Sequence, residues 1–418
     1  MNRRAYVLAD DRTGAAETAG AFAAALGSKV AVTTPAMWTA EGSRSLDEID
    51  LIVVDLGTRH LAPAEATRRC RELIESIGDR ALLGQKMDST LRGNWAAEAV
   101  AIRTALGRPV VVVAAFPAAG RVCVDGVVSE HGVPVHLGPA GRDPRMPVRS
   151  SRPADLVRAA APECLVAEAP DLAAAAAALD AGSVDFVVLD ASDDRQLVAA
   201  AGFVRDRGAV LCGTAAALGA LANPSARRAP GVDVVIDGSV VVASASRHPA
   251  ALAQCEALRD AGANDWVPGE LRRTDGTGGV VLVTPWRVPT GTVDPGIRWA
   301  ESIGDEARGA TVALGASTLV LVGGDTAAAA LGDEPFIVDG LLAPGVATGF
   351  VPALGDVRVV TKPGGFGEPS LLAALLADPL AATATPGDPP ADPSAADPPD
   401  LPSDRSRAVG PISGRMKR

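Results

Sequence analysis

Short apolar runs alternate with longer alanine-rich stretches along most of the chain. Runs of Val, Leu and Ile bounded by polar residues are typical of strands buried on both faces, and the stretches between them have helical length. The strands expected in the first half are Tyr6–Ala9, Lys29–Thr33, Leu51–Asp55, Ala81–Gln85, Val110–Ala114 and Phe186–Asp190. The expected helices are Ala15–Leu26, Pro63–Ile77, Trp95–Leu106, Leu172–Ala181 and Asp194–Arg207. This alternation predicts an α/β fold in which helices cover both faces of a mostly parallel sheet.

Turn formers and charges at Asn223–Gly231 interrupt the alternation, so we place a domain boundary there. The N-terminal domain is then residues 1–226 and the C-terminal domain residues 227–377. The C-terminal pattern predicts strands at Val232–Ile236, Ser239–Ala243, Val280–Val283 and Thr318–Val322, and helices at Pro249–Ala261, Ile297–Arg308 and Ala327–Leu331. Residues 378–418 are rich in Pro, Asp, Ala and Ser without apolar periodicity, which predicts a disordered tail.

Composition narrows the classes of function. A chain of 418 residues, 48% of them hydrophobic, can build two cores. Few aromatic residues (3%) and a net charge of −11 argue against nucleic acid and anionic membranes as partners, although a local basic pocket for a small anion remains compatible. Five widely spaced cysteines without a C-x-x-C pair predict free thiols. Without a membrane-length apolar run or a signal-type N-terminus, we expect a cytoplasmic protein.

Charged side chains gather where the predicted strands end. Asp10 and Asp11 follow the first strand, Asp55 ends the third, and Lys86–Asp88 follow the fourth. Because ligands of parallel sheets bind at the carboxyl ends of the strands, one crevice is expected to collect these groups. A carboxylate at Asp10 or Asp11 can accept the proton of a substrate hydroxyl, but an aspartate at this position also serves as an ordinary helix cap.

Three arginine and lysine side chains near these strand ends are candidates for binding an anion. The cluster Lys86-Met87-Asp88-Ser89-Thr90-Leu91-Arg92-Gly93-Asn94 includes the planar fork of Arg92, which suits a carboxylate, although an ion pair with Asp88 explains it equally well. Arg59 follows the strand that ends at Asp55 and is a better anion contact than the isolated His60 beside it.

Two glycine turns in the second half are candidate phosphate cradles. Gly323-Gly324-Asp325-Thr326 leads from a predicted strand into a helix, where N–H groups and the helix dipole favour anions. Lys362-Pro363-Gly364-Gly365-Phe366-Gly367 is a second such turn, and a simple hairpin is the alternative. The chain has neither a Walker-type G-x-x-x-x-G-K-[ST] nor the protein-kinase motif set. Carboxylates, cations and glycine turns together indicate phosphoryl transfer.

The order and residue sequences of these clusters resemble those of the four-carbon acid sugar kinase family, which was formerly described as a domain of unknown function. That family shows A-D-D-L-T-G, K-x-D-S-T-L-R-G-N, P-A-F-P-x-x-G-R-x-x-x-x-G, G-G-D-T and K-x-G-G-F-G, in this order. The corresponding segments are Ala9–Gly14, Lys86–Asn94, Ala114–Gly126, Gly323–Thr326 and Lys362–Gly367. The resemblance covers Tyr6 to about Leu376.

The resemblance implies a two-domain α/β enzyme, with a mostly parallel sheet in each domain and the active site in the cleft between them. Its N-terminal domain would hold a sugar acid such as threonate, erythronate or a 3-oxo-tetronate, and its C-terminal domain would hold ATP with Mg²⁺. Phosphate would move to the terminal hydroxyl of the acid. The expected partners are these small molecules and, as a further expectation, a second copy of the chain.

The family's functional residues can be carried onto matching positions. Asp10 and Asp11 would contact the substrate hydroxyls, with one of the two available as the base. The rest of the acid pocket would be Arg59, Lys86, Asp88, Ser89 and Arg92, walled by Phe116–Arg121 with Arg121 facing the acid. The nucleotide side would be Ser244, Ser246, Gly323, Gly324, Asp325, Thr326, Pro344-Gly345, Gly364 and Gly365. The resemblance assigns no metal ligands.

The chain departs from the family pattern at several positions. Arg12 stands where leucine is usual, and this cation either contacts an extra negative group or points outward. Ala243 and Ala245 replace smaller or polar residues of the serine loop, and Pro363 removes an N–H from the last glycine turn. Two alternatives therefore stay open: a non-catalytic sugar-acid and nucleotide-binding protein of the same fold, or a kinase for a different small hydroxy acid. A dinucleotide enzyme is a weaker alternative, because no G-x-G-x-x-G follows the first strand.

Overall fold

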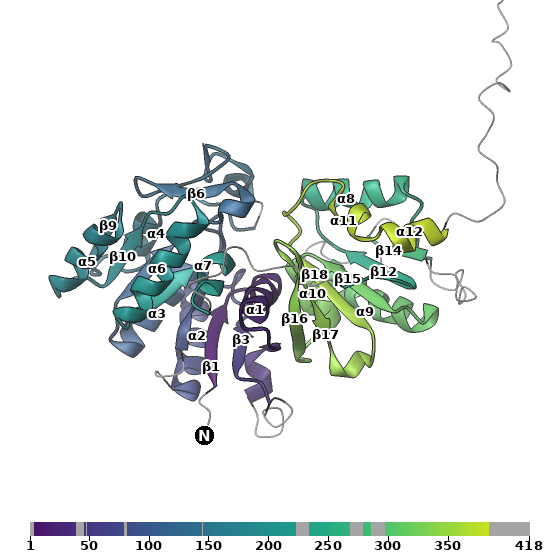
Figure 1. Ribbon diagram of the computed structural model, residues 1–418, viewed down its shortest axis with the longest axis horizontal. Helices are drawn as coiled ribbons and strands as arrows, with labels where there is room; N and C mark the ends of the chain where they lie inside the picture. The colour runs from purple at the N-terminus through teal and green to yellow at the C-terminus, as the bar shows by residue number, and fades with distance from the viewer. Residues whose placement is uncertain are drawn as a thin grey trace, which may run out of the picture. The chain divides into compact units, whose positions relative to one another are not determined.

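Strands from both halves of the chain join in one fifteen-stranded sheet (Figure 1). The computed structural model describes residues 4–38, 46, 48–78, 82–143, 145–222, 234–267, 279–285 and 297–383. Its strand order is β13-β14-β12-β15-β18-β17-β16-β2-β3-β1-β4-β11-β5-β10-β9. None of the helices in these ranges is both long and apolar enough to traverse a bilayer.

The first half of the chain contributes eight parallel strands to this sheet. In spatial order they are β2 (Val30–Thr33), β3 (Leu51–Asp55), β1 (Ala5–Ala9), β4 (Leu82–Lys86), β11 (Val210–Gly213), β5 (Val110–Val113), β10 (Phe186–Leu189) and β9 (Val166–Ala169). The helices of this half are α1 (Arg12–Leu26), α2 (Pro63–Ile77), α3 (Trp95–Leu106), α4 (Pro153–Ala160), α5 (Leu172–Asp180), α6 (Asp194–Asp206) and α7 (Ala215–Gly219). A small antiparallel sheet of β6 (Arg121–Val124), β7 (Val127–Glu130) and β8 (Val133–Pro134) lies apart from the main sheet.

The second half adds five parallel strands and one antiparallel hairpin. The parallel strands are β13 (Asn264–Asp265), β14 (Gly279–Val283), β12 (Ser239–Ser244), β15 (Thr318–Val322) and β18 (Arg358–Lys362). The hairpin is β16 (Phe336–Ala343) and β17 (Val346–Phe350), and β16 pairs antiparallel with β2. The helices are α8 (Pro249–Asp260), α9 (Ile297–Leu314), α10 (Gly324–Leu331), α11 (Leu371–Leu375) and α12 (Ala377–Thr383).

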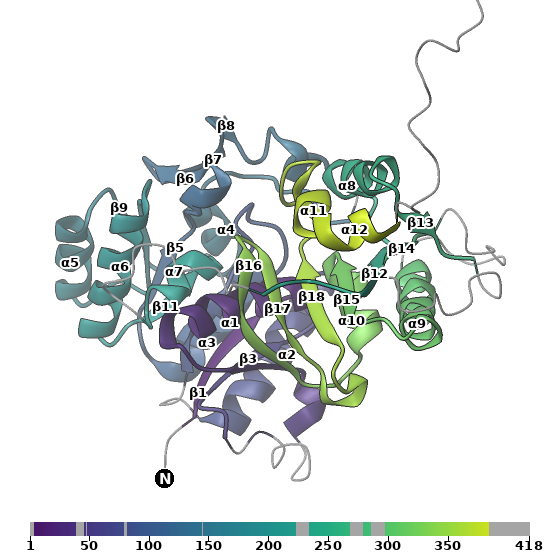
Figure 2. The ribbon, with the colours of Figure 1, turned by 45° about the vertical axis from the view of Figure 1, so that its right-hand side comes forward.

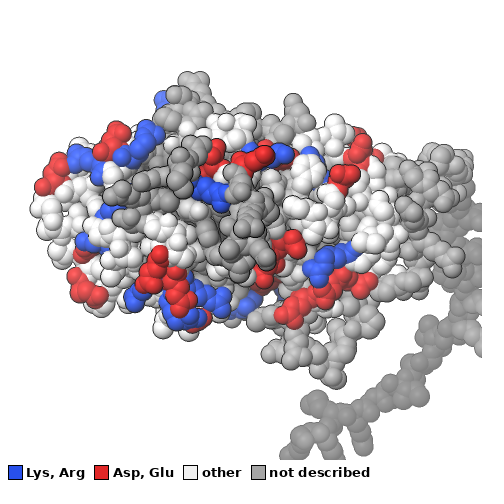
Figure 3. Space-filling model, turned by 90° about the horizontal axis from the view of Figure 1, so that it is seen from below, with Lys and Arg blue, Asp and Glu red and all other residues white. Residues whose placement is uncertain are grey.

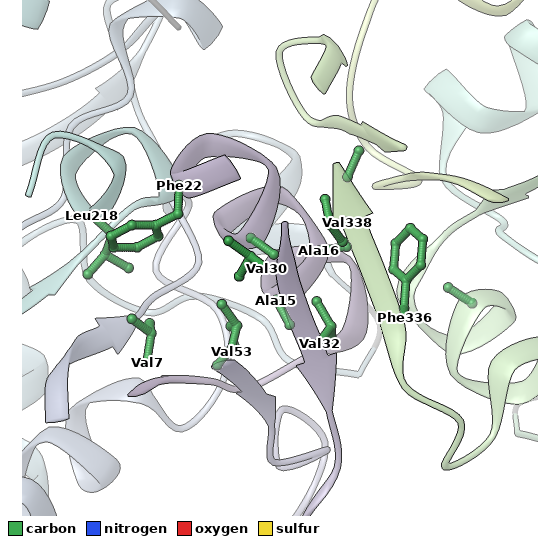
Figure 4. Packing of buried hydrophobic residues seen from close by; sticks show 14 of the residues in the cluster. Val7, Ala15, Ala16, Phe22, Val30, Val32, Val53, Leu218, Phe336 and Val338 are labelled. Carbon is green, nitrogen blue, oxygen red and sulfur yellow. The ribbon is translucent and has the colours of Figure 1, made fainter. Parts of the chain in front are cut away.

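Helix α1 packs on strands from both halves. Figures 1 and 2 show it beside β16, and Gly20 is the point of closest approach, because a Cβ there would overlap the side chain of Leu341. One hydrophobic core accordingly runs across the junction. Figure 4 shows Ala16, Val32, Phe336 and Val338 packed together there, and all four are buried. The face in Figure 3 shows acidic and basic side chains interspersed.

The predicted α/β class and mostly parallel sheet are confirmed, and Leu51–Asp55, Pro63–Ile77, Trp95–Leu106 and Thr318–Val322 have the expected bounds. The expected strand at Val232–Ile236 is wrong where it can be checked, because residues 234–236 form no strand, while residues 232 and 233 lie outside the described residues. The predicted boundary at 226/227 also lies outside them, so the division into two domains stays a prediction.

Helical structure continues past two expected ends, that of the helix Ile297–Arg308 and that of the C-terminal domain at residue 377, because the turns beyond them still bury apolar side chains. Helix α9 continues from Arg308 to Leu314, which is 5% exposed. Helix α12 extends to Thr383 and buries Leu380, so ordered chain continues past Asp378, where the tail was expected to begin. Most of that predicted tail, residues 384–418, lies outside the described residues.

Candidate functional site

The carboxyl ends of β1, β3 and β4 lie level with one another. Ala9 pairs in register with Asp55 on one side and with Lys86 on the other. The residues that follow these strands therefore meet at one edge, as the parallel arrangement predicts. This edge brings Asp10 and Asp11 close to the segment that begins at Lys86.

Asp11 is both the N-cap of α1 and an ion-pair partner of Arg59. Its Oδ1 accepts from the Gly14 N–H at 3.0 Å, its Oδ2 accepts from the Thr13 hydroxyl at 2.8 Å, and Arg59 Nη2 lies 2.8 Å from Oδ1. The cap explains why α1 begins at Arg12 rather than at the expected Ala15. Burial alone would raise the pKa of Asp11, but Arg59 and Lys86 together hold it below its ordinary value, so this carboxylate is ionised.

Asp10 is fully buried and is held by a two-pronged contact with Arg59. Nε and Nη2 of Arg59 donate to the two carboxylate oxygens, each at 2.8 Å. Burial raises the pKa of Asp10 even though Arg59 opposes the shift. Because Asp10 is fully buried while Asp11 is partly exposed, Asp10 orients this guanidinium rather than presenting a base to a substrate.

Asp88 and Arg92 form the ion pair that the sequence left open. Arg92 Nη2 donates to Asp88 Oδ1 at 2.9 Å and Nε donates to Oδ2 at 3.1 Å, while Nη1 reaches Asp143 Oδ2 at 3.3 Å. The Thr90 hydroxyl also donates to Asp88. Against the effect of burial, Arg92 and Arg59 hold the pKa of Asp88 well below its usual range. Both nitrogens of the Arg92 fork thus donate to Asp88, and a contact of Arg92 with the substrate stays a prediction.

Lys86 is buried at the end of β4, with an exposure of 4%. Within the described part of the chain, its ammonium forms neither a hydrogen bond nor an ion pair, although the position of a Cβ on Gly14 would lie only 3.0 Å from its Nζ. On the other side of the cluster, Arg121 Nη1 donates to the Ser89 hydroxyl at 2.6 Å and Nε donates to Glu130 at 2.8 Å. Lys86 is therefore available to an added anion in a way that Arg121 is not.

The serine loop and two glycine turns converge at the carboxyl ends of β12, β15 and β18. The Gly323 N–H donates to Lys362 O at 2.7 Å, and the Ala245 N–H donates to the Thr326 hydroxyl at 3.0 Å. A Cβ on Gly364 would overlap the Ser246 hydroxyl, so a larger residue there would force the Ser246 side chain to move. Helix α10 begins at Gly324, three residues before the expected Ala327, and its first-turn N–H groups point out of the helix end.

The strand-end residues of the two halves meet at Gly324 and Phe366. A Cβ on Gly324 would lie 2.7 Å from Asp11 Oδ2, so the start of α10 directly adjoins the carboxylate of Asp11. Phe366, from the second glycine turn, stacks on Phe116 with ring centroids 5.7 Å apart, and the Arg121 guanidinium lies 5.9 Å from the Phe366 centroid.

Two further contacts join these halves at Asp325. Arg145 Nη1 donates to Asp325 Oδ2 at 2.7 Å, and His60 Nε2 lies 3.8 Å from Oδ1.

Gly345 packs with its Cα against the Phe366 ring, and Gly365 packs against the ring of His248. Of the predicted nucleotide-side residues, these two thus adjoin aromatic rings rather than the Asp11 carboxylate.

Of the two expectations for Arg12, an outward-pointing side chain is wrong. It is buried, its Nε donates to Asp55 Oδ2 at 2.9 Å, and its Nη2 donates to the carbonyl of Gly332 at 2.9 Å. Because Gly332 is the C-cap of α10, this guanidinium ties the strand-end edge of the first half to the helix that carries Gly324. The sequence shows the cation but not its partner, since Gly332 lies 320 residues away.

Two buried glutamates in this region were not recognised from the sequence. Glu98 on α3 accepts from the Thr58 hydroxyl and from Gln85 Nε2, the latter at 2.9 Å. Glu17 on α1 is 7% exposed, and no described residue bonds to its Oε1. The available signal was a charged residue within a mostly apolar helix, which is unusual unless the charge is exposed or has a function.

A Mg²⁺ ion would need few protein ligands here. No group of three or more metal-ligating side chains occurs among the described residues. Mg²⁺ in phosphoryl-transfer enzymes usually retains water and takes one or two carboxylates together with the phosphates of the nucleotide. An ion that arrives with its nucleotide would therefore be held mainly by phosphate and water oxygens.

Comparisons with known proteins agree with this arrangement. The family described as a sugar-binding N-terminal domain matches residues 5–221. A D-threonate kinase of Bordetella bronchiseptica is 32% identical over 400 residues, which cover 88% of this chain and 95% of that protein. A D-erythronate kinase of Heliobacterium modesticaldum is 38% identical over 159 residues, 37% of this chain and 35% of that protein.

The fold also has relatives among solved structures. A Haemophilus influenzae protein of the DUF1537 family superposes with a TM-score of 0.65 at 19% identity, covering 90% of this chain and 98% of that one. At this identity the likeness supports the fold alone. On the family match and the nearly full-length relative from Bordetella bronchiseptica, the chain belongs to the four-carbon acid sugar kinase family.

Proposed function

We propose that this protein is an ATP-dependent kinase that phosphorylates the terminal hydroxyl of a four-carbon sugar acid such as threonate, erythronate or a 3-oxo-tetronate. One observation carries the proposal. The N-terminus of α10, of the kind that binds phosphate groups, adjoins the Asp11 carboxylate, and Asp11 lies at the same edge of the sheet as Lys86. A donor and an acceptor bound at these two places would be neighbours. Full-length similarity to a protein named D-threonate kinase supports the same class of reaction.

On the acceptor side, Lys86 would take the carboxylate of the acid, because its ammonium is not neutralised by any described residue. Asp11 would orient a hydroxyl group. A carboxylate offers about four lone-pair positions, and the contacts of Asp11 with Gly14, Thr13 and Arg59 leave room for one further donor. Ser89, held by Arg121, would line the same space.

On the donor side, the first-turn N–H groups of α10 would face the terminal phosphates, where the helix dipole favours negative charge. Gly364 lets the second glycine turn approach Ser246 closely, which shapes a cradle that any larger residue would fill. Mg²⁺ bound with the nucleotide would neutralise charge on the phosphates.

Catalysis in this scheme depends mainly on alignment. Phosphoryl transfer proceeds through a loose transition state, so the protein contributes most by holding the two reactants in line and compensating charge. The lowered pKa of Asp11 makes it a weak proton acceptor but a constant hydrogen-bond acceptor at neutral pH. Asp11 would accordingly hold the attacking hydroxyl, with proton removal late in the reaction.

The proposal is tested by ADP release with threonate, erythronate, their 3-oxo forms and longer aldonates. We expect activity on at least one four-carbon acid. Replacing Lys86 by Met should lower kcat/KM at least 100-fold, whereas Lys29→Met, which changes an exposed lysine, should leave it unchanged. Asp11→Asn should also abolish activity while circular dichroism shows an intact fold.

The alternative outcomes are distinct. Binding of acid and nucleotide by calorimetry without ADP formation would identify a non-catalytic binding protein. Activity only on a different hydroxy acid would retain the kinase and change its substrate. Full activity of Lys86→Met and Asp11→Asn would refute the site.

A further inference from the structure

Glu17 is a buried carboxylate that the mechanism above does not use. It lies on the second turn of α1, is 7% exposed, and its Oε1 has no hydrogen-bond partner among the described residues. A buried carboxylate without partners destabilises a fold, because desolvation is not compensated. Its presence in a helix of alanines and glycines calls for an occupant that completes its hydrogen bonds.

The position of Glu17 directs it toward Lys86. Gly14 lies one turn before Glu17 on the same face of α1, and a Cβ on Gly14 would be 3.0 Å from Lys86 Nζ. Helical side chains lean back toward the N-terminus, so Glu17 extends over this same spot. The charges that act on it most strongly are those of Lys86 and then Arg121, followed by the carboxylates of Asp11 and Asp88.

Glu17 is an acidic and Lys86 a basic side chain, yet they form no ion pair in the described structure. The charge of Lys86 acts on Glu17 without a hydrogen bond or ion pair between them, and Glu17 Oε1 has no hydrogen-bond partner among the described residues. A group that bridges them must accept a hydrogen bond from an ammonium and donate one to a carboxylate. A hydroxyl does both at once.

We propose that Glu17 is a substrate-binding residue that accepts a hydrogen bond from a hydroxyl of the sugar acid, while Lys86 donates to that same hydroxyl or to the neighbouring carboxylate. This inference rests on the proposed function and extends it, because it assigns the recognition of one specific substrate hydroxyl to a residue of α1. Burial raises the pKa of Glu17, with Lys86 and Arg121 opposing the shift, so the hydroxyl contact also favours its ionised form. An ordered water is the competing occupant.

The stability of variants separates a ligand contact from a structural role. Glu17→Leu removes a buried, unpartnered carboxylate and fills similar space with apolar atoms, so its Tm should equal or exceed that of the wild type. A glutamate that holds the fold together would instead show a large drop in Tm on this substitution. Glu75→Gln, on the exposed side of α2, serves as the matched control and should change neither Tm nor activity.

Substrate discrimination gives the decisive measurement. With the preferred acid and its monodeoxy analogues, the wild type should lose 10- to 100-fold in kcat/KM when the contacted hydroxyl is missing. In Glu17→Leu the kcat/KM for the parent acid should fall by a similar factor. The kcat/KM values for the parent acid and for that analogue should then differ by less than threefold. Glu17→Gln, which keeps an acceptor oxygen, should retain part of the discrimination.

The outcomes distinguish this inference from the proposed function. If the wild type is active and Glu17→Leu keeps full discrimination against every deoxy analogue, a water occupies the site and the inference is wrong. If no acid is phosphorylated, calorimetry of the same acids and analogues with both proteins still tests the contact. If no acid binds at all, both proposals fail together.

Discussion

Glu98 provides a stability prediction whose sign is unusual for a carboxyl group. It is fully buried on α3 behind Asp10, where it accepts from the Thr58 hydroxyl and from Gln85. Burial, reinforced by the charge of Asp10, raises the pKa of Glu98 from 4.5 to about 7. Most paired carboxylates stabilise proteins as pH rises, whereas this one should destabilise the fold once it ionises.

The sign and size follow from proton binding. Between pH 4.5 and about 7 the folded chain keeps a proton on Glu98 that the unfolded chain has released, so the free energy of unfolding falls through this window. The penalty is absent below the unfolded pKa and complete above the folded one. At about 1.4 kcal/mol per pKa unit, the full penalty is about 3 kcal/mol, and most of it develops between pH 5 and pH 8.

The assay is urea unfolding of wild type and Glu98→Gln at pH 5 and pH 8. Glutamine cannot ionise, so the free energy of unfolding of the variant should gain about 2 to 3 kcal/mol relative to wild type between these pH values. Comparing two pH values cancels any constant cost of the rearranged hydrogen bonds to Thr58 and Gln85. Glu75→Gln should show no such pH-dependent gain. An equal difference between wild type and Glu98→Gln at both pH values would show that Glu98 is already ionised at pH 5.

Two further predictions concern contacts between the halves of the chain. Arg12→Leu restores the residue usual in the family. It should lower the free energy of unfolding by about 3 kcal/mol, because it leaves Asp55 buried without its ion pair. Adding Asp55→Asn should recover much of this loss, as measured by urea unfolding in a double-mutant cycle. Phe366→Ala should lower the free energy of unfolding by only about 1 kcal/mol, because it loses the stacking on Phe116. It should nevertheless raise the KM for ATP in the ADP-release assay, because it loosens the glycine turn. An unchanged KM would show that this turn does not touch the nucleotide.

The sequence was sufficient for the features that depend on local pattern. Apolar runs and helical stretches predicted the α/β class, and the rule for parallel strand ends predicted that Asp10, Asp11 and Lys86 would share one edge. Helix starts were less accurate, because capping by Asp11 and the open turn at Gly323 were not weighed against the apolar pattern. These differences concern single turns and leave the topology intact.

The antiparallel hairpin β16–β17 could not be predicted in the same way. Its pairing with β2 joins Phe336 to Val32, which lie some 300 residues apart, and no local pattern selects a partner at that distance. The same limit applies to ion pairs. A spacing of four residues allows Asp88 and Arg92 to pair, but it is equally compatible with both side chains facing a ligand. Only the three-dimensional geometry distinguishes these two arrangements.

The distribution of ion pairs then determines which cation can bind the substrate. Three guanidinium groups near the strand ends are already neutralised by buried aspartates. These pairs are Arg12–Asp55, Arg59–Asp10 and Arg92–Asp88, at 2.9, 2.8 and 2.9 Å. Taking a buried guanidinium from its carboxylate to serve a ligand would leave that carboxylate uncompensated, which costs more than a new contact returns. The arginines therefore act on the aspartates, holding Asp11 and Asp88 ionised and in place. Lys86 has no such partner in the described structure, which is why the proposed function gives it the carboxylate of the incoming acid and the further inference gives the neighbouring Glu17 one of its hydroxyls.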